Sequence, residues 1–345
     1  MKLTLTSGIL AASFAMTPTH ADTPLIDAFS DLLGSCWAYS AEGRIDEIYS
    51  ADELAPVYEM YCFERMENHF VRIRRQAPGP HGGAFFNEEI LQWNAAYDTI
   101  ITVMFTNLLS WGHINYRDGI VQDGRVILDI SDDESSSSQA RLIWGAVQGD
   151  QFSLTIERDM GENYGGWVAA PARIYTRQDA SVGPALDALM TGGATFTPAT
   201  ELFQPLLGAC WSTEINDSGA TDTHCFTDLM GRYVRDRHIV PGNPAYSGET
   251  LFFADRESDS IEFYYYNSIG GISEGYDVHA ANGIAYDHEN YRGPNGEDQT
   301  FRGRYEDISY RGYISITEEL QGEDWVEVSR QTFTRTEHNP FETID

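Results

Sequence analysis

The chain repeats itself, and this internal duplication constrains its fold more than any other feature of the sequence. Residues 32–37 (LLGSCW) match residues 206–211 (LLGACW), and residues 101–107 align without gaps on residues 261–267. Further matches follow in the same order: Cys62-Phe63 with Cys225-Phe226, Arg72-x-Arg74 with Arg235-x-Arg237, and Trp167 ten residues before Arg177 with Trp325 ten residues before Arg335. Because so many landmarks keep one order, the chain consists of two copies of one module.

The four cysteines divide evenly between the two copies. In each copy one cysteine precedes a tryptophan and the other precedes a phenylalanine. Of the three connectivities that four cysteines allow, only Cys36–Cys62 with Cys210–Cys225 keeps each copy self-contained, so we predict this pairing. The sequence has no Cys-x-x-Cys motif, which favours structural disulfides over a redox-active pair.

The first 21 residues have the pattern of a secretory signal. Lys2 provides a positive start, residues 3–16 form a mostly apolar run, and Thr19-His20-Ala21 places small residues where a signal peptidase cleaves. The apolar run is shorter than the roughly 20 residues that a membrane-spanning helix needs. We therefore expect residues 1–21 to be removed and the protein to be periplasmic or secreted, without membrane insertion.

The remaining chain is strongly acidic. Lys2 is the only lysine, so the 22 basic residues leave 21 arginines in the exported protein, against 53 acidic residues. Such a charge repels nucleic-acid phosphates and anionic lipids, so we expect neither as a partner. Solubility in a salty medium explains the acidity better than an acidic binding surface does, and we expect a monomer.

Each module reads as a series of short β-strands separated by turn signals. No long segment has a helical period. About ten short strands per module suit either an up-and-down barrel or a sandwich. We prefer the barrel, because it leaves no sheet edge exposed. In the second copy the expected strands lie near residues 209–215, 221–227, 232–240, 248–254, 260–267, 271–279, 283–291, 299–309, 311–319 and 324–335.

The domain plan follows from the repeat. We predict an all-β protein with a first barrel over residues 22–178, a linker over 179–194 and a second barrel over 195–345, each barrel having about ten strands and a short N-terminal helix. Residues 201–207 suit that helix in the second copy. Within the linker, residues 181–190 suit another short helix.

Alternation along one strand assigns faces to its residues. Side chains of a strand point alternately to its two sides. In residues 260–267 the apolar positions are the odd ones, so we expect Ile261, Phe263, Tyr265 and Asn267 to face the interior. The ungapped alignment extends this expectation to the odd positions of residues 101–107, including Asn107.

A short helix, a Gly-x-Cys-Trp start and an arginine on the final strand resemble the lipocalin and fatty-acid-binding superfamily, most closely uncharacterised lipocalin-like secreted bacterial proteins. Lipocalins carry Gly-x-Trp, one residue shorter than the motif present in both copies here. In that superfamily the first-strand Trp packs beneath an Arg of the last strand. The resemblance therefore implies barrel closure by Trp37 with Arg177 and by Trp211 with Arg335. It also implies a pocket for a small, mostly apolar molecule.

The second copy holds the most reactive set of side chains. Asp222 and His224 share a strand face, and a histidine beside a carboxylate acts as a general base in many enzymes. The first copy has Glu59 and Tyr61 at the corresponding positions, and no hydrolase or phosphate-loop motif occurs in the chain. We therefore place no catalytic residue and keep a hydrolase- or isomerase-like enzyme as an alternative.

The histidines do not present a metal-site spacing. His224, His238, His279 and His288 fall on different predicted strands. A barrel could bring some of them together around a metal, but structural or surface roles explain them best. We expect no metal and no cofactor, with haem ligation by His279 or His338 as an outside option.

The Arg-x-Arg pairs allow two interpretations. Facing inward, Arg235 and Arg237 would hold a ligand carboxylate; facing outward, they would offset nearby acids, which is the interpretation we favour. The favoured function is an exported binding protein that encloses a small apolar or amphipathic ligand in one or both barrels. A structural protein with filled barrels is a further alternative. The candidate ligand contacts are His224, Arg235, Arg237, Phe263, Tyr265, Asn267 and Asn107.

Overall fold

The computed structural model describes residues 23–44, 54–66, 69–79, 84–95, 97–107, 113–130, 139–161, 166–191, 197–215, 219–242, 245–255, 260–293 and 296–341. The predicted signal peptide at residues 1–21 lies outside them. Within the described residues the protein is mainly β, as predicted. The chain divides between Met190 and Thr191 into two compact units.

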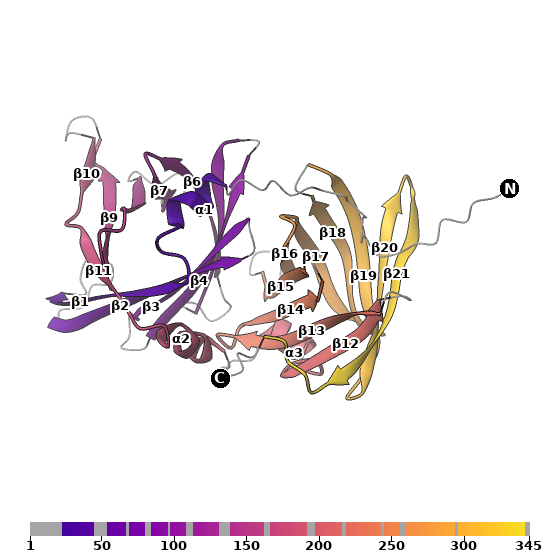
Figure 1. Cartoon of the computed structure of the whole chain (residues 1–345). Helices are drawn as coiled ribbons and strands as arrows, with labels where there is room; N and C mark the ends of the chain where they lie inside the picture. The colour runs from indigo at the N-terminus through magenta and orange to yellow at the C-terminus, as the bar shows by residue number, and fades with distance from the viewer. Residues whose placement is uncertain are drawn as a thin grey trace. The chain divides into compact units, whose positions relative to one another are not determined.

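The first unit is a closed antiparallel barrel (Figure 1). Each strand from β1 to β9 pairs with the next, β9 also pairs with β11, and β11 pairs with β1, so ten strands close the ring. The short strand β10 pairs antiparallel with the C-terminal end of β9. The elements are α1 (Pro24–Phe29), β1 (Ser35–Arg44), β2 (Leu54–Met66), β3 (Phe70–Pro78), β4 (Ala84–Asn94), β5 (Thr99–Thr106), β6 (His113–Gln122), β7 (Arg125–Asp129), β8 (Ala140–Trp144), β9 (Gln151–Asp159), β10 (Trp167–Ala169), β11 (Arg173–Arg177) and α2 (Val182–Met190).

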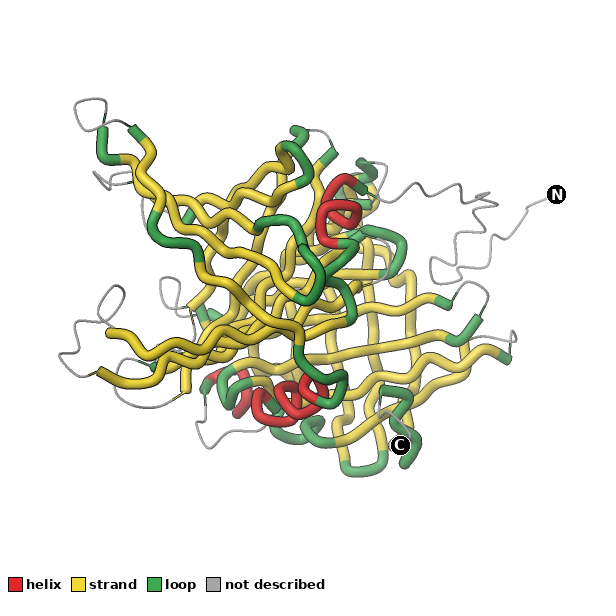
Figure 2. The backbone as a smooth tube through the Cα atoms, turned by 60° about the vertical axis from the view of Figure 1, so that its left-hand side comes forward, coloured by secondary structure: helices red, strands yellow, loops and turns green. Residues whose placement is uncertain are grey.

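The second unit is also a closed barrel, and its ten strands follow one another around the ring. Figure 2 shows that strands make up most of the described chain. Every pairing is antiparallel, and β12 closes the ring against β21. The elements are α3 (Pro198–Leu202), β12 (Ala209–Ile215), β13 (Ala220–Leu229), β14 (Tyr233–Val240), β15 (Tyr246–Ala254), β16 (Ile261–Asn267), β17 (Ile272–Ala281), β18 (Gly283–Arg292), β19 (Asp298–Ser309), β20 (Gly312–Gln321) and β21 (Asp324–Thr336). All ten strands coincide with the predicted ones to within three residues at either end.

A short helix precedes the first strand of each barrel and packs into its core. Thr23 caps α1 by accepting a hydrogen bond from the Ile26 amide. Pro24 stands at the first helical position, where a backbone N–H would have no partner within the helix, so proline costs nothing there. In α3 a Thr197–Thr200 capping box has the same effect. Phe29 of the first copy and Phe203 of the second are fully buried. Each helix thus fills one part of its barrel with aromatic side chains.

Both predicted disulfides are present. Cys36 lies directly opposite Cys62 on β1 and β2, and Cys210 lies directly opposite Cys225 on β12 and β13. Each disulfide therefore joins the first two strands of its own barrel.

The strand register places the expected closure residues side by side. Trp37 on β1 pairs with Arg177 on β11, and the guanidinium carbon of Arg177 lies 4.2 Å from the centre of the Trp37 ring. Trp211 on β12 pairs with Arg335 on β21. There Arg335 is exposed, and the buried Trp211 ring packs edge-on against Tyr313 at 5.6 Å.

The inward assignment was wrong for β5. Ile100 belongs to the core of the first barrel, and Thr102 pairs with Leu91, another core residue. The even positions of β5 therefore face the interior. Val103 and Phe105, which the ungapped alignment placed inside, lie on the opposite face, although both are buried.

Two matching pairs of hydrogen bonds locate the error. Asn107 and Phe86 exchange two bonds: the Asn107 amide donates to the Phe86 carbonyl, and the Phe86 amide donates to Asn107 Oδ1. Ser268 and Ser247 exchange the same two bonds, with Ser268 Oγ as the side-chain acceptor. The counterpart of Asn107 is therefore Ser268 and not Asn267. The alignment slipped by one residue, and such a slip exchanges the two faces of a strand.

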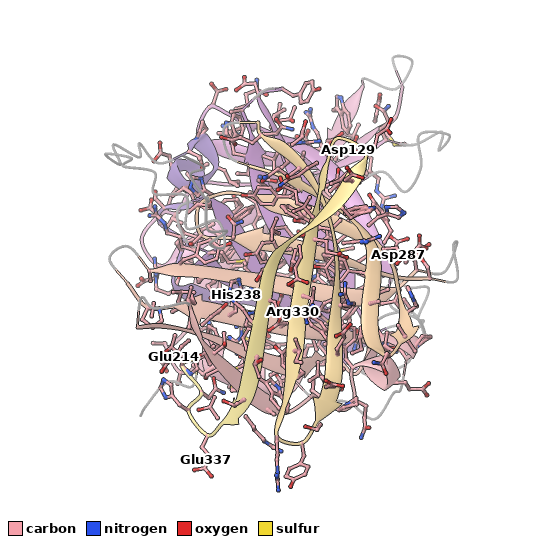
Figure 3. All side chains as sticks on the ribbon, turned by 90° about the vertical axis from the view of Figure 1, so that its right-hand side faces the viewer. Asp129, Glu214, His238, Asp287, Arg330 and Glu337 are labelled. Atoms are coloured by element: carbon pink, nitrogen blue, oxygen red, sulfur yellow. A yellow bond between two sulfur atoms is a disulfide. The ribbon has the colours of Figure 1, made fainter. Side chains whose placement is uncertain are left out.

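The outer wall of the second barrel carries ion pairs at its surface. Arg330, labelled in Figure 3, lies 2.8 Å from Glu327 on β21. Arg302 on β19 lies 2.8 Å from Glu318 on β20. Because all four side chains are at least partly exposed, these pairs contribute little to stability.

Candidate functional site

A tight turn between β13 and β14 brings the two histidines together. Met230 and Gly231 both have positive φ, and Asp228 Oδ1 accepts a hydrogen bond from the Gly231 amide at 2.6 Å. Positive φ at two successive residues is typical of a hairpin turn that matches strand twist. This turn sets the register in which His224 lies opposite His238.

The same register decides which side chains face the barrel interior. Phe226 on β13 and Val234 on β14 belong to the core of the second barrel. Because side chains alternate along a strand, Asp222 and His224 share the inner face of β13, and Asp236 and His238 share the inner face of β14. We call these four residues the polar cluster.

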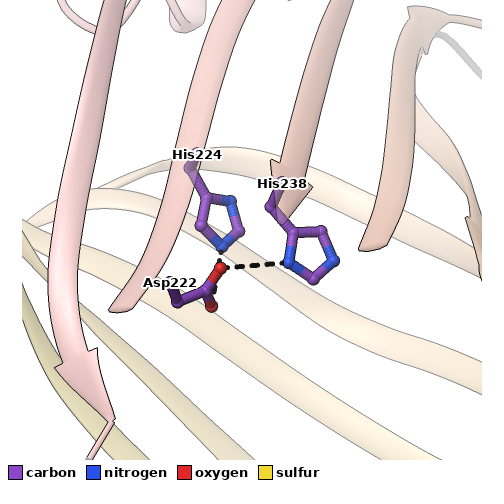
Figure 4. Close-up of side chains that lie close together, drawn as sticks. All are labelled: Asp222, His224 and His238. Atoms are coloured by element: carbon purple, nitrogen blue, oxygen red, sulfur yellow. Dashed lines mark hydrogen bonds and ion pairs between the residues drawn. The ribbon is translucent and has the colours of Figure 1, made fainter. Parts of the chain in front are cut away.

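The polar cluster is a connected chain of contacts, of which Figure 4 shows Asp222, His224 and His238. His224 Nδ1 lies 2.8 Å from Asp236 Oδ2, and His224 Nε2 lies 3.4 Å from Asp222 Oδ2. His238 Nδ1 lies 3.2 Å from Asp222 Oδ1. The two imidazole rings stack with their centres 4.6 Å apart. Each histidine therefore contacts a carboxylate, and His224 contacts two.

Two tyrosines extend the network across neighbouring strands. His238 Nε2 lies 3.0 Å from the hydroxyl of Tyr265 on β16, and that hydroxyl lies 2.6 Å from the hydroxyl of Tyr246 on β15. Gly248 on β15 makes room for this arrangement, because a Cβ atom there would overlap both His238 and Tyr265. Burial raises the pKa of Tyr265 well above its usual value, so its hydroxyl stays protonated.

The neighbouring carboxylates keep His224 positively charged. Burial alone lowers the pKa of His224, but the carboxylates of Asp236 and Asp222 outweigh burial and raise that pKa to about 10. Burial raises the pKa of Asp222, but His224 and His238 outweigh it and hold the pKa well below its usual value. Near neutral pH the site therefore holds an imidazolium between two carboxylates. The His224 side chain is 19 % exposed, which makes it the most accessible member of the cluster.

The predicted ligand contacts separate into three groups. Phe263 and Tyr265 pack in the core of the second barrel, and Tyr265 touches the polar cluster. Asn267 is buried, but its Oδ1 accepts hydrogen bonds from the amides of Ile269 and Gly271, so it shapes the turn after β16. Asn107 similarly binds the backbone at the start of β4.

The Arg-x-Arg residues form the third group, and they do not border the interior. Arg235 and Arg237 alternate with the inward-facing residues of β14 and so lie on its outer face. Arg235 Nε lies 3.1 Å from Glu249, and the Arg237 guanidinium lies 4.6 Å from the Phe341 ring centre. The two arginines thus lie on the outer face of β14, but Arg235 is buried beside Glu249 and does not face solvent.

Sequence reasoning missed the way in which the cluster is assembled. Asp236 and Tyr246 were absent from the candidate contacts, and the pairing of His224 with His238 was not anticipated. The Met230-Gly231 turn signal contained this information, since a tight turn there places residues at equal distances from it opposite each other. Counting six residues back from Met230 and six forward from Arg232 reaches His224 and His238.

The first barrel carries a different polar group at the corresponding positions. Glu59 is almost fully buried and lies 2.6 Å from Arg75 Nε and 2.8 Å from Arg173 Nη1. The hydroxyls of Tyr61 and Tyr175 also donate to Glu59. Burial raises the pKa of Glu59, but the two guanidinium groups outweigh it and lower the pKa below its usual value. Both barrels thus hold buried ions at this level, but only the second barrel uses histidine.

The remaining histidines of the second barrel lie at its surface. His279, His288 and His338 are exposed, and His279 Nδ1 contacts the carbonyl of Asp277 at 2.8 Å. None of the three joins the polar cluster. Their placement gives no support to haem ligation by His279 or His338.

Comparison with known proteins yields little. No family model matches the sequence, and no curated protein matches it. A crystal structure of a protein of unknown function from the DUF3598 family of Nostoc punctiforme is similar over 92 % of this chain and all of that chain, at 11 % identity and a TM-score of 0.19. The barrel assignment therefore rests on strand pairing alone. Among the described residues, no helix is long and apolar enough to cross a membrane.

Proposed function

We propose that this protein is an exported binding protein of lipocalin-like design whose second barrel binds a small amphipathic molecule. The observation that carries the proposal is the polar cluster, which faces the interior of an aromatic barrel and keeps His224 partly accessible. Ligand sites typically combine an apolar lining with a few converging polar groups. The second barrel presents this combination.

The cluster indicates the kind of polar group that such a ligand carries. Asp222 and Asp236 contribute two negative charges and His224 one positive charge, so the three together are net negative. A head group that donates hydrogen bonds, or one that is cationic, fits this charge best. The apolar part of the ligand would contact the aromatic side chains of the same interior, among them Phe263, Tyr286 and Tyr305.

The same geometry argues against catalysis by His224. A general base must be unprotonated at the working pH. The two carboxylates keep His224 protonated near neutral pH, because they raise its pKa to about 10. A hydrolase or isomerase that uses His224 as its base is therefore less well supported than a binding protein.

A structural protein with filled barrels is the second candidate, and one observation favours it. The Phe263 ring lies directly over Gly275 on the neighbouring strand, where a Cβ atom would overlap it. Aromatic rings that lie across glycines occupy interior volume that a ligand would need. The two candidates differ in whether the second barrel carries a molecule.

Export is supported by the two disulfides. Disulfides persist in oxidising compartments such as the periplasm or the extracellular medium, and all four cysteines are paired. With the signal-like residues 1–21, this supports a periplasmic or secreted protein. Amino-terminal sequencing of protein from its own host checks the proposal, which predicts a mature chain that begins near residue 22.

Native mass spectrometry of protein purified from its own host tests the binding function. We expect a mass above that of the polypeptide, lost on denaturation, and an organic molecule in the denatured extract. Tyr265→Phe should reduce the bound fraction, since it removes a hydroxyl of the cluster network. Tyr264→Phe is the matched control, because Tyr264 lies on the other face of the same strand. A wild-type chain that always has its polypeptide mass favours the filled-barrel candidate.

A further inference from the structure

We propose that Asp222, His224 and His238 form a binding site for one divalent transition-metal ion of the zinc type. Each residue offers one ligand atom, and the three atoms lie within 4.8 Å of one another. Figure 4 shows the two imidazoles converging on the Asp222 carboxylate. The site goes beyond the proposed binding function, because it requires no organic ligand.

The orientation of the two rings carries the proposal. His224 Nδ1 is engaged by Asp236 and His238 Nε2 by Tyr265, so the two remaining ring nitrogens both face Asp222. They lie 3.4 Å and 3.2 Å from its two oxygens. In a tetrahedral zinc site two ligand atoms are about 3.3 Å apart, because each bond is about 2.0–2.1 Å long. The two nitrogen-to-oxygen separations match this value, although they involve different oxygens of Asp222; the three ligand atoms together lie within 4.8 Å of one another.

The outer partners of the histidines match those of metal ligands. A metal-bound histidine almost always donates its other ring N–H to a carboxylate, a backbone carbonyl or a water, which fixes the ring orientation. For His238 the Tyr265 hydroxyl would take the place of such a water. Asp236 provides this contact for His224, and Tyr265 provides it for His238. The rings are thus held with their other nitrogens directed at the Asp222 carboxylate, where an ion would bind.

Charge is balanced when an ion binds. The metal takes the place of the proton that His224 holds on the Asp222 side, and that proton leaves to solvent. A divalent ion then offsets the negative charges of Asp222 and Asp236. Two imidazole nitrogens and one carboxylate favour zinc, copper, nickel or cobalt over magnesium or calcium, which prefer oxygen ligands.

The duplication provides an internal comparison. The positions of Asp222, His224 and His238 correspond to Glu59, Tyr61 and Arg75 in the first barrel, where the arginine is already bound to Glu59. A guanidinium group cannot act as a metal ligand, since it has no lone pair to offer. We therefore expect one ion per chain and not two.

Titration of the full chain, first treated with a chelator, tests the site. Isothermal titration with Zn²⁺ should give one ion per chain, and Co²⁺ should give the visible absorption of a tetrahedral nitrogen–oxygen site. His238→Gln should weaken Zn²⁺ binding by more than about 100-fold, since loss of an outer partner alone costs roughly 10–100-fold. His279→Gln and His288→Gln, at exposed positions of the same barrel, should leave binding unchanged.

A second variant keeps the test decisive if His238→Gln does not fold, as judged by circular dichroism. Tyr265→Phe retains all three ligands and should weaken Zn²⁺ binding by about 10-fold through loss of the outer contact. Wild-type protein that binds no stoichiometric zinc, or variants that bind as tightly as wild type, would overturn the proposal. Zinc bound without any organic molecule supports the metal site and contradicts the proposed function. An organic molecule bound to protein that takes up no zinc supports the proposed function and contradicts the metal site.

Discussion

His224 and His238 lie directly opposite each other on β13 and β14, with their imidazole rings stacked 4.6 Å apart. This contact joins two carboxylates and two tyrosine hydroxyls into one network inside the second barrel. In the metal-free protein the positive charge of His224 separates Asp222 from Asp236. The stability of the second barrel therefore depends on the charge of this single side chain.

His224→Gln should destabilise the second barrel by about 3–5 kcal/mol, because removing one partner of a buried ion pair leaves the other charge uncompensated. Urea unfolding in the presence of a chelator, followed by tryptophan fluorescence, measures the change. His288→Gln, at an exposed position, should stay within about 0.5 kcal/mol of wild type. Equal stabilities for the two variants would show that the network contributes little.

Acid should destabilise the first barrel through Glu59. The two arginines lower the folded-state pKa of Glu59 below its usual value of 4.5. A group with a lowered folded pKa contributes stability above its unfolded pKa and loses that contribution as the pH falls through the folded pKa. The free energy of unfolding, measured between pH 7 and pH 2, should therefore decrease once the pH drops below about 4.5. Glu59→Gln should be less stable at pH 7 and should show a shallower acid dependence.

Removal of one disulfide should affect its own barrel. The double variant Cys210→Ser, Cys225→Ser should lose about 2–4 kcal/mol of stability, because the open chain gains conformational entropy on unfolding. Denaturant unfolding with intact protein as reference measures this loss. The sequence separation is 15 residues here and 26 between Cys36 and Cys62, so removing the latter pair should cost slightly more.

The contact between Arg177 and Trp37 should stabilise the closure of the first barrel. Because the Arg177 side chain is 38 % exposed, Arg177→Ala should cost only about 0.5–1 kcal/mol. Arg177→Lys should recover part of this loss, since it keeps the positive charge. Arg335→Ala in the second barrel is the comparison, because Arg335 pairs with Trp211 as Arg177 pairs with Trp37 and its side chain is exposed. Thermal unfolding of the three variants measures these differences.

Much of the fold follows from local pattern in the sequence. The repeat identified the disulfide partners, because each cysteine keeps its place beside a Trp or a Phe in both copies. The strands of the second barrel were located to within a few residues, since turn signals and apolar composition are properties of short segments. The same information failed for β5. Phe105 is buried on the outer face, so apolar character there did not distinguish inside from outside.

The sequence by itself determined the duplication, the cysteine pairing and the positions of the strands in the second barrel. Only the tertiary structure decided which polar residues meet. Asp222 and His224 were visible as strand neighbours, but the contacts with Asp236, His238 and Tyr265 depend on hairpin register and on ring closure. A shift of one residue exchanges the two faces of a strand, so faces, and with them the candidate site, are fixed by pairing between strands rather than by any strand alone.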